Sequence, residues 1–334
     1  MGSFESVVMR SLWRIAKGIT GEKIPMLAGH KLLYTCNLRC HMCPFWRRPD
    51  EVLLTLDEEK KMMNSLADFG VSFMGFEGGE PFLRRDLPEI LSYSHKKFYT
   101  SLVSNGWALK EKISQVKDSL DHLFISIDGI GETHDRLRGM EGSYRRAVEG
   151  IEAASRYVPV SLSSTITSEN CQEVEQIVDL ARTLGVTVSF QIAYDYSTAE
   201  SMSPNSQKLK SAIEKLLEMK MKGAPIVESH EYFEAVINSW YKGIPWRCKP
   251  WLTLNIDPQG KVVLPCYVLN EYTGSGKVWE MDLRKAWNSV DWKTYESCNK
   301  CALSCYLEPS LFNWSNAGMV KERIIDNMLS YFSS

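Results

Sequence analysis

Three cysteines lie within the short stretch CNLRCHMC. Three residues separate Cys36 from Cys40, and two separate Cys40 from Cys43. A four-iron cluster takes four thiolates, so a loop with only three would leave one iron open to bind another molecule. A structural zinc ion is the alternative, because His41 could complete the four ligands that zinc requires. The spacing is unusual for zinc, and it favours a cluster with an open iron.

A second group of cysteines lies near the C-terminal end, and Cys171 alone stands apart, as an ordinary helical residue. The members of this group are Cys248, Cys266, Cys298, Cys301 and Cys305. A C-x2-C step together with two distant cysteines is typical of the ligands of zinc or of an iron–sulfur cluster. We predict that the first four are the ligands, with Cys305 as an alternative to either neighbour or a spare.

The composition is that of a folded, water-soluble protein. Hydrophobic residues make up 44% and charged residues 24%, and a net charge of -2 gives no general attraction to nucleic acid. The sequence has no apolar run long enough for a membrane span and no secretory signal. We therefore expect a cytoplasmic protein, whose nine cysteines bind metal and do not form disulfides.

Strand and helix patterns alternate from residue 31 to about 225 and indicate roughly six βα units. The predicted strands are 31–35, 71–76, 100–106, 122–129, 158–167 and 187–193. The predicted helices are 55–70, 86–98, 108–120, 143–157, 172–185 and 205–220. Thr55 and Glu58 have the spacing of a capping box. Such alternation predicts parallel strands with right-handed crossovers, whose carboxyl ends gather the chemistry.

Polar motifs follow several of these strands. The second strand ends in GFEGGEP, where Gly78 and Gly79 would let the backbone approach a ligand and Glu80 could accept hydrogen bonds from an ammonium group. Further candidates at strand ends are Asn105, Ser126, Asp128 and Arg138. Solvation of a strand end is the other explanation for such residues.

With these motifs the chain resembles the radical S-adenosylmethionine (radical SAM) enzymes, whose motif is C-x3-C-x-aromatic-C after the first strand. The resemblance implies an α/β fold, a partial (β/α)6 TIM-like barrel over residues 31–225. It also implies a [4Fe–4S] cluster whose open iron binds S-adenosylmethionine. Reductive cleavage then yields a 5′-deoxyadenosyl radical that abstracts hydrogen from an unactivated carbon.

The resemblance also assigns cofactor contacts. It implies that Gly78, Gly79 and Glu80 bind the methionine amino group. Ser126 or Asp128 would reach the ribose or the substrate, Arg138 would steady the ligand carboxylate, and Asn105 is a weaker candidate. Met42 stands where the family usually has an aromatic residue against the adenine, and methionine is flexible enough to pack there.

The second cysteine group resembles the auxiliary-cluster modules called twitch and SPASM, with Gly260 in the expected hairpin. Five cysteines favour one auxiliary [4Fe–4S] cluster. We predict a small Cys-rich α+β domain at 226–312, a lead-in at 1–30 and a closing helix at 313–334. Four cysteine ligands would suit the auxiliary cluster to electron exchange and not to substrate binding.

The substrate is predicted from weaker features. Residues 4–19 form an amphipathic helix with a basic face, suited either to packing on the barrel or to peripheral contact with a membrane. Loop arginines at the strand ends suggest an anionic ligand, and they are Arg47, Arg48, Arg84, Arg85 and Arg138. We therefore expect a lipid, isoprenoid or other small-molecule substrate. About 30 residues before the first strand are too few for the peptide-binding domain of many peptide-modifying relatives.

Two alternatives remain at this stage: modification of a ribosomally made peptide or protein, and a zinc or redox scaffold without catalysis. For the enzyme we expect an electron donor such as ferredoxin or flavodoxin. Asp195 and Glu77 are the candidate proton acceptors, because both follow strands at the carboxyl end of the barrel.

Overall fold

The computed structural model describes residues 21–194, 206–244, 246–269 and 272–311. The predicted helix at 4–19, the predicted helix at 313–334 and Asp195 lie outside these residues. In the described residues nine strands form one sheet in the order β6-β5-β4-β3-β2-β1-β7-β8-β9. The strands are β1 Leu27–Lys31, β2 Phe73–Glu77, β3 Tyr99–Ser104, β4 His122–Ser126, β5 Val160–Ile166, β6 Thr187–Ile192, β7 Thr253–Ile256, β8 Lys261–Leu264 and β9 Tyr272–Lys277.

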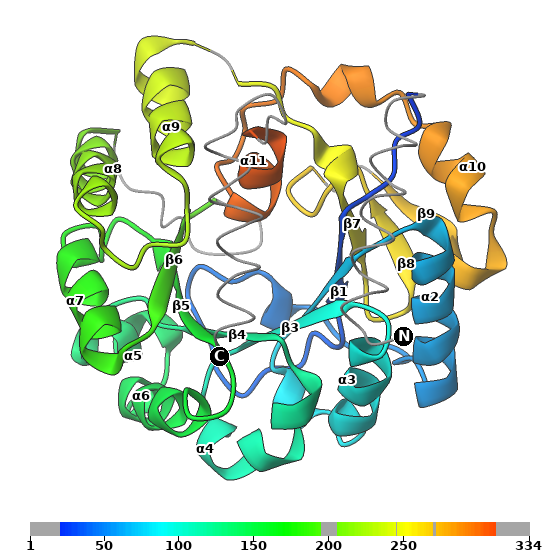
Figure 1. Cartoon of the computed structure of the whole chain (residues 1–334), viewed down its shortest axis with the longest axis horizontal. Coiled ribbons are helices and arrows are strands. Elements are labelled where there is room, and N and C mark those ends of the chain that lie inside the picture. The colour runs from blue at the N-terminus through cyan, green and yellow to red at the C-terminus, as the bar shows by residue number, and fades with distance from the viewer. Residues whose placement is uncertain (1–20, 195–205, 245, 270–271, 312–334) are drawn as a thin grey trace.

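Strands β1 to β6 are all parallel, and helices pack around the outside of the curved sheet (Figure 1). The helices are α2 Leu56–Phe69, α3 Leu87–His95, α4 Leu109–Lys112, α5 Glu132–Arg138, α6 Ser143–Ala154, α7 Val174–Leu184, α8 Ser206–Met221, α9 His230–Lys242, α10 Leu283–Asn288 and α11 Ser304–Leu311. Because β6 and β9 end the described sheet without meeting, the barrel is open. The predicted partial TIM-like barrel is confirmed.

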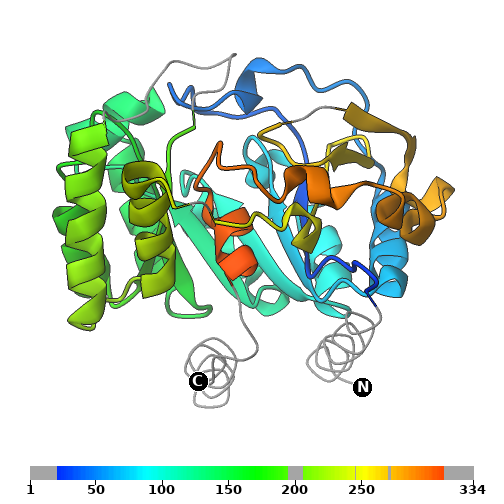
Figure 2. The ribbon, with the colours of Figure 1, turned by 90° about the horizontal axis from the view of Figure 1, so that it is seen from above.

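The C-terminal strands continue the barrel sheet. Strand β7 pairs with β1 in parallel, and β8 and β9 follow as an antiparallel meander. Helix α11 lies inside the curve of the sheet (Figure 2), where the hydroxyl of Thr253 donates to the carbonyl oxygen of Cys305 at 2.9 Å. The region predicted as a separate small domain therefore shares its sheet with the barrel.

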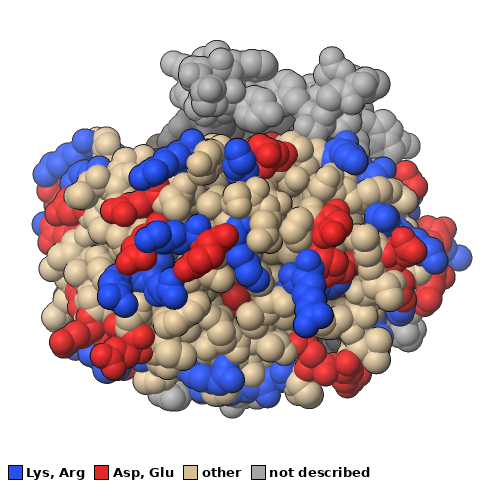
Figure 3. Space-filling model, turned by 90° about the horizontal axis from the view of Figure 1, so that it is seen from below, with Lys and Arg blue, Asp and Glu red and all other residues tan. Residues whose placement is uncertain are grey.

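The surface carries both charges. Lysine and arginine side chains alternate with aspartate and glutamate over the face in Figure 3. Within the described residues no helix is both long enough and apolar enough to cross a membrane.

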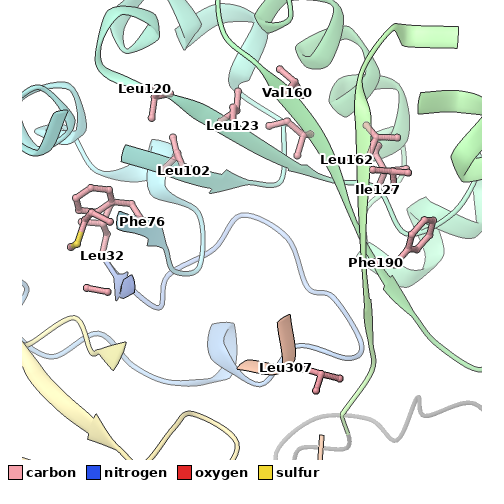
Figure 4. Packing of buried hydrophobic residues seen from close by; sticks show 14 of the residues in the cluster. Leu32, Phe76, Leu102, Leu120, Leu123, Ile127, Val160, Leu162, Phe190 and Leu307 are labelled. Carbon is pink, nitrogen blue, oxygen red and sulfur yellow. The ribbon is translucent and has the colours of Figure 1, made fainter. Parts of the chain in front are cut away.

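The core lies between the sheet and the outer helices. Alternate strand residues such as Leu102, Leu123 and Leu162 point away from the barrel interior and are fully buried (Figure 4). His30 lies on the same outer face, where its Nε2 meets the carboxylate of Glu59 in α2. The intervening residues, including most of those on β2 and β3, stay partly exposed along the inner face. The inner face is therefore the surface that a bound molecule would meet.

Several elements differ from the prediction. Strand β1 begins and ends four residues earlier than expected, because Leu27–His30 pair with both β2 and β7. The predicted helix 108–120 is broken into one α-turn and two 3-10 turns. Helix α9 was not predicted from the sequence; Ser229 caps it, and its apolar side chains are buried. The capping box of Thr55 and Glu58 is present as predicted.

Candidate cluster sites

The three cysteines of the first group lie on the long connection between β1 and α2, here called the cysteine loop (residues 32–55). Each sulfur has an N–H group directed at it. The amides of Leu38 and Phe45 donate to Cys36 and Cys43, both at 3.4 Å. Arg138 Nη1 lies 3.8 Å from the sulfur of Cys40. Hydrogen bonds to sulfur favour the thiolates that ligate iron–sulfur clusters, so these residues fit such a cluster.

The Gly-Gly pair after β2 packs directly against the start of the cysteine loop. The amide of Gly79 donates to the carbonyl oxygen of Leu33 at 2.7 Å. A Cβ at Gly79 would lie 2.0 Å from the carbonyl oxygen of Thr35, and one at Gly78 would lie 2.5 Å from that of Leu33. The glycines admit the backbone that leads to Cys36, and the predicted close approach of a ligand to them stays a prediction.

Glu80 is buried, and its carboxylate is held by three hydrogen bonds within the fold. Its carboxylate accepts hydrogen bonds from the amides of Phe82 and Asn105 and from the hydroxyl of Ser104, at 2.8 to 3.1 Å. Burial raises the pKa of Glu80, while these hydrogen bonds oppose the rise. Glu80 therefore fixes the loop after β3 relative to β2.

Asn105 links the loop after β3 to the cysteine loop. Its Nδ2 donates to Oδ1 of Asn37 at 2.8 Å and lies 3.8 Å from the sulfur of Cys36. Asn105 thus lies beside the first cysteine, and its predicted contact to the cofactor stays a prediction. Its partner Asn37 was not singled out by the sequence. Its position between two cysteine-loop residues suits it to orient that loop.

Arg138, at the end of α5, contacts the cysteine loop from the opposite side. Its Nη2 lies 2.5 Å from Oδ2 of Asp128, and both side chains are buried. Its carbonyl oxygen accepts from the amide of Arg39, and that of Leu137 accepts from His41. Arg138 Nε is also buried without a hydrogen-bond partner within the described structure. This orphan donor and its charge fit a bound anion such as a carboxylate.

The thiols of the loop differ in their surroundings. Burial raises the pKa of Cys40 to about 12, against the lowering effect of Arg138, and burial also raises the pKa of Cys36. A coordinated metal deprotonates such thiols outright.

The cysteine loop is braced by Asp50 and Trp46, which the sequence did not single out, and by Arg47, which was predicted as a contact to an anionic ligand. Asp50 accepts from the amides of Tyr34 and Thr35, at 2.6 and 2.8 Å. Trp46 Nε1 donates to the carbonyl oxygen of Cys40 at 2.9 Å, and Arg47 donates to that of Cys43. Only their position within the loop could have indicated these roles.

Four cysteines of the second group line one small pocket of about 20 Å³. Its lining includes Cys248, Cys266, Cys298 and Cys301, which are the four predicted ligands. The remaining lining is mostly apolar and consists of Trp246, Pro250, Val268, Leu269, Tyr295, Tyr306 and Leu307. The amide of Leu269 donates to the sulfur of Cys266 at 3.4 Å. Four thiols around a largely apolar hollow fit an auxiliary iron–sulfur cluster.

No three His, Cys, Asp or Glu side chains of the described residues are grouped so that they could hold a single metal ion. Burial raises the pKa of Cys248 and of Cys301 to about 12 in each case. Mutual repulsion between the cysteines contributes to both rises.

Cys305 is absent from the lining of this pocket and is exposed. It lies close enough to Glu77 and Lys31 for their charges to act on its thiol. Lys31 donates to Glu77 Oε1 at 2.8 Å, and its ammonium lies 3.8 Å from the ring centre of Phe45. Cys305 therefore lies beside the inner face of the barrel, near Cys301 and Cys266 but outside the pocket that they line.

The structure also gives the positions of three further predicted residues, Met42, Ser126 and Arg84. Met42 is half-buried in the turn before Cys43, and Ser126 is buried opposite Ser163 of β5. Arg84 is not exposed to an anionic ligand at the strand ends, because it is buried in ion pairs with Glu59 and Asp86.

Comparison with known proteins agrees with the fold. Residues 31–181 match the family described as the Radical SAM superfamily, and residues 186–325 match a domain of unknown function, DUF3463. The chain is 34% identical to the Fe-coproporphyrin III synthase of Methanosarcina barkeri over 43% of its own length and 38% of that relative. It is 28% identical to the PqqA peptide cyclase of Rhizobium meliloti over 83% of its length and 79% of that relative.

Solved structures share the architecture. The Streptococcus suis protein SuiB bound to its precursor peptide SuiA superimposes with a TM-score of 0.64 at 14% identity, covering 89% of this chain and 69% of that chain. A native anSMEcpe structure with bound AdoMet and a peptide gives a TM-score of 0.59 at 17% identity, covering 92% of this chain and 98% of that one.

The preference for a lipid or small-molecule substrate over a peptide is wrong. The relatives that match most of this chain are peptide cyclases. Of the features behind the preference, Arg84 is held in ion pairs with Glu59 and Asp86, and residues 4–19 lie outside the described residues, so their role stays a prediction.

Members of the matched family use S-adenosylmethionine and a [4Fe–4S] cluster, and SPASM-type relatives carry auxiliary clusters. The three-cysteine loop at the carboxyl end of β1, the open barrel and the four-cysteine pocket agree with this match, and residues 31–181 form a domain of the radical SAM superfamily of enzymes.

Proposed function

We propose that this protein is a radical SAM enzyme that modifies a peptide or protein substrate. The observation that carries the proposal is the combination of a three-cysteine loop with a separate four-cysteine pocket along one sheet. The substrate class is supported by the PqqA peptide cyclases, which match 83% of the chain.

We assign the first cluster to Cys36, Cys40 and Cys43. When bound there, it supplies the electron that cleaves S-adenosylmethionine into methionine and a 5′-deoxyadenosyl radical. Arg138 holds its guanidinium beside Cys40 and offers its unpartnered Nε to the carboxylate of the ligand. Asn105 orients the loop through Asn37.

Glu80 and the two glycines act mainly by positioning. Glu80 already accepts three hydrogen bonds, so its part is to hold Asn105 at the cysteine loop. Gly78 and Gly79 let β2 lie against the residues before Cys36. Ser126 and Met42 are proposed as further contacts to S-adenosylmethionine, because both lie at the carboxyl end of the barrel.

We assign the auxiliary cluster to Cys248, Cys266, Cys298 and Cys301, all within residues 226–312. These four cysteines would hold the cluster, which would supply electron exchange with the substrate or the first cluster. Cys305 is left outside this set. The barrel at 31–225 and the auxiliary region then act as one unit, because β7 joins their strands.

Glu77 is the candidate proton acceptor within the described chain. Lys31 donates to it at 2.8 Å and orients its carboxylate along the inner face of the barrel. Asp195 remains a prediction, since it lies outside the described residues.

The first experiment tests the clusters. The protein is purified without oxygen, reconstituted with iron and sulfide, and assayed for iron and for 5′-deoxyadenosine formed from S-adenosylmethionine. About eight irons per chain support both sites, about four remove the auxiliary cluster, and a colourless zinc-loaded protein contradicts the proposal.

The second experiment tests the substrate class. Peptide and lipid extracts are compared between a strain that lacks the gene and its parent. A peptide whose mass differs between the two strains, and which the purified enzyme converts, supports the proposal. Changed lipids with unchanged peptides would contradict it.

A further inference from the structure

Two glycines lie side by side on neighbouring strands of the barrel, although neither their backbone conformation nor the space around them requires glycine. Gly29 of β1 is paired with Gly75 of β2. Neither residue has a left-handed φ. A Cβ on either would meet nothing closer than 3.5 Å, which is an ordinary contact. Glycine within a strand weakens it and often marks a position where a ligand approaches closely.

Both glycines belong to the inner face. Their neighbours Ala28, His30 and Met74 are fully buried toward the outer helices, and side chains alternate along a strand. Gly29 and Gly75 themselves are only partly buried. They therefore open toward the barrel interior.

The row continues across two more strands. Gly75 is paired with Ser101 of β3, and Gly29 is paired with Asn255 of β7. We call Ser101, Gly75, Gly29 and Asn255 the inner patch. Every member is small or polar, and Ser101 and Asn255 carry hydrogen-bonding groups at the two ends of the row.

One of those groups has no partner. Asn255 is 5% exposed, and its Nδ2 is buried without a hydrogen bond in the described structure. Its Oδ1 lies 3.5 Å from the Cβ position of Gly29, and Oε1 of Glu77 lies 4.0 Å from the same point. A buried donor without an acceptor is uncommon in folded proteins and calls for one. The Cβ position of Gly29 is therefore flanked by a donor-bearing amide and a carboxylate.

The charges beside the inner patch limit the kind of chemical group that it can bind. Lys31 forms an ion pair with Glu77, so the surroundings of the patch are close to neutral. A carboxylate would meet Glu77, and an ammonium group would meet Lys31. A neutral group with one acceptor and one N–H donor satisfies both Asn255 and Glu77, and an amide has both.

We propose that the inner patch binds an amide of the peptide substrate, either in its main chain or in an Asn or Gln side chain. This inference rests on the proposed function and specifies the recognised group. Lys31 lies five residues before Cys36, and Glu77 directly precedes the Gly-Gly pair. The patch therefore holds the substrate below the loop that carries the first three cysteines.

The first test uses small probes on the reconstituted holoenzyme. N-methylacetamide, acetate and ethylammonium are compared by saturation-transfer NMR. Gly29→Ala and Gly75→Ala each add one methyl group to the patch without a clash. Gly276→Ala is the matched control, because its Cβ on β9 would also meet nothing within 3.5 Å. N-methylacetamide is expected to bind the parent and the control, and about fivefold more weakly to the two patch variants. Equal binding to all proteins, or stronger binding of acetate, overturns the proposal.

The second test uses the modified peptide found above. Gly29→Ala and Asn255→Leu should raise its KM about tenfold, while peptide-independent formation of 5′-deoxyadenosine stays at the parent level. An unchanged KM in both variants overturns the inference and leaves the proposed function intact. If no peptide is converted, the proposed function fails, and the NMR comparison still decides whether the patch binds amides.

Discussion

Asp128 and Arg138 form a buried ion pair, with Oδ2 and Nη2 2.5 Å apart, that connects the barrel sheet to the cysteine loop. Asp128 also accepts from the amide of Thr165 in β5 at 2.7 Å, and Arg138 reaches the sulfur of Cys40 at 3.8 Å. Burial raises the pKa of Asp128, and the charge of Arg138 opposes the rise. The position of Cys40 is thus tied to β5 through two charged side chains.

Breaking this pair should cost both stability and iron. Asp128→Asn leaves the guanidinium of Arg138 buried without its counter-charge, a change that costs about 3–5 kcal/mol of unfolding free energy. We expect a fall of that size in urea unfolding, together with reduced iron at the first site.

Arg136→Gln is the matched control for that variant. Arg136 lies on the same helix α5 and pairs with Glu169, but its side chain is 54% exposed. Removing such a surface pair should change the unfolding free energy by less than about 1 kcal/mol. Similar losses of unfolding free energy in Asp128→Asn and Arg136→Gln would contradict the stabilising role assigned to the buried pair.

Gly79→Ala should remove the first cluster and spare the second. The added Cβ would lie 2.0 Å from the carbonyl oxygen of Thr35, so the backbone that leads to Cys36 must move. After reconstitution we expect about four irons per chain and no 5′-deoxyadenosine. Gly276→Ala, which creates no such contact, should keep the iron content of the parent. Parent-level cleavage by the Gly79→Ala enzyme would contradict the role assigned to this glycine.

Local features were predictable from the sequence, and long-range pairing was not. The Thr55–Glu58 capping box depends on residues three positions apart and appears as expected. The pairing of β7 with β1 joins distant parts of the chain, and no local pattern indicates it. Helix α9 was predictable, because Tyr232, Phe233 and Val236 are spaced as one helical face.

The candidate site shows the same difference between residues that the local sequence identifies and contacts that form only in the folded chain. The cysteines are identified by their types and spacing, since few other residues bind iron–sulfur clusters. The bracing role of Asp50 depends on two backbone amides before Cys36, and the use of Glu80 depends on a neighbouring strand. Such contacts exist only once the strands are assembled, so residue types alone could not assign them.

Serine substitutions should separate the auxiliary ligands from Cys305. Replacing Cys266 or Cys301 removes a thiol from the pocket, and we expect about four irons to be lost while 5′-deoxyadenosine formation partly survives. Cys305→Ser should keep the full iron content, because that thiol lies outside the pocket lining. The measurement is iron and sulfide per chain after reconstitution. Loss of four irons from Cys305→Ser would instead make it a ligand.

Glu228 should make stability depend on pH. Its carboxylate accepts from Ser189 Oγ at 2.6 Å and from the amide of Phe190 at 2.9 Å, and it is 1% exposed. Burial raises its pKa to about 7. Since the folded protein holds this proton more tightly than the unfolded chain, the stability from this group is complete below about pH 4. That stability is lost as the pH rises through 7.

The contribution of Glu228 to the free energy of unfolding should therefore fall by an amount on the order of 3 kcal/mol between acidic and neutral solution. It is measured by urea unfolding at pH 5 and pH 8 for the parent and for Glu228→Gln, which carries no titrating group at this position. The parent should lose more stability than the variant by that amount. Glu218→Gln, on the exposed side of α8, should behave as the parent does. Equal pH dependence in the parent and Glu228→Gln would mean that Glu228 is ionised in the fold without cost.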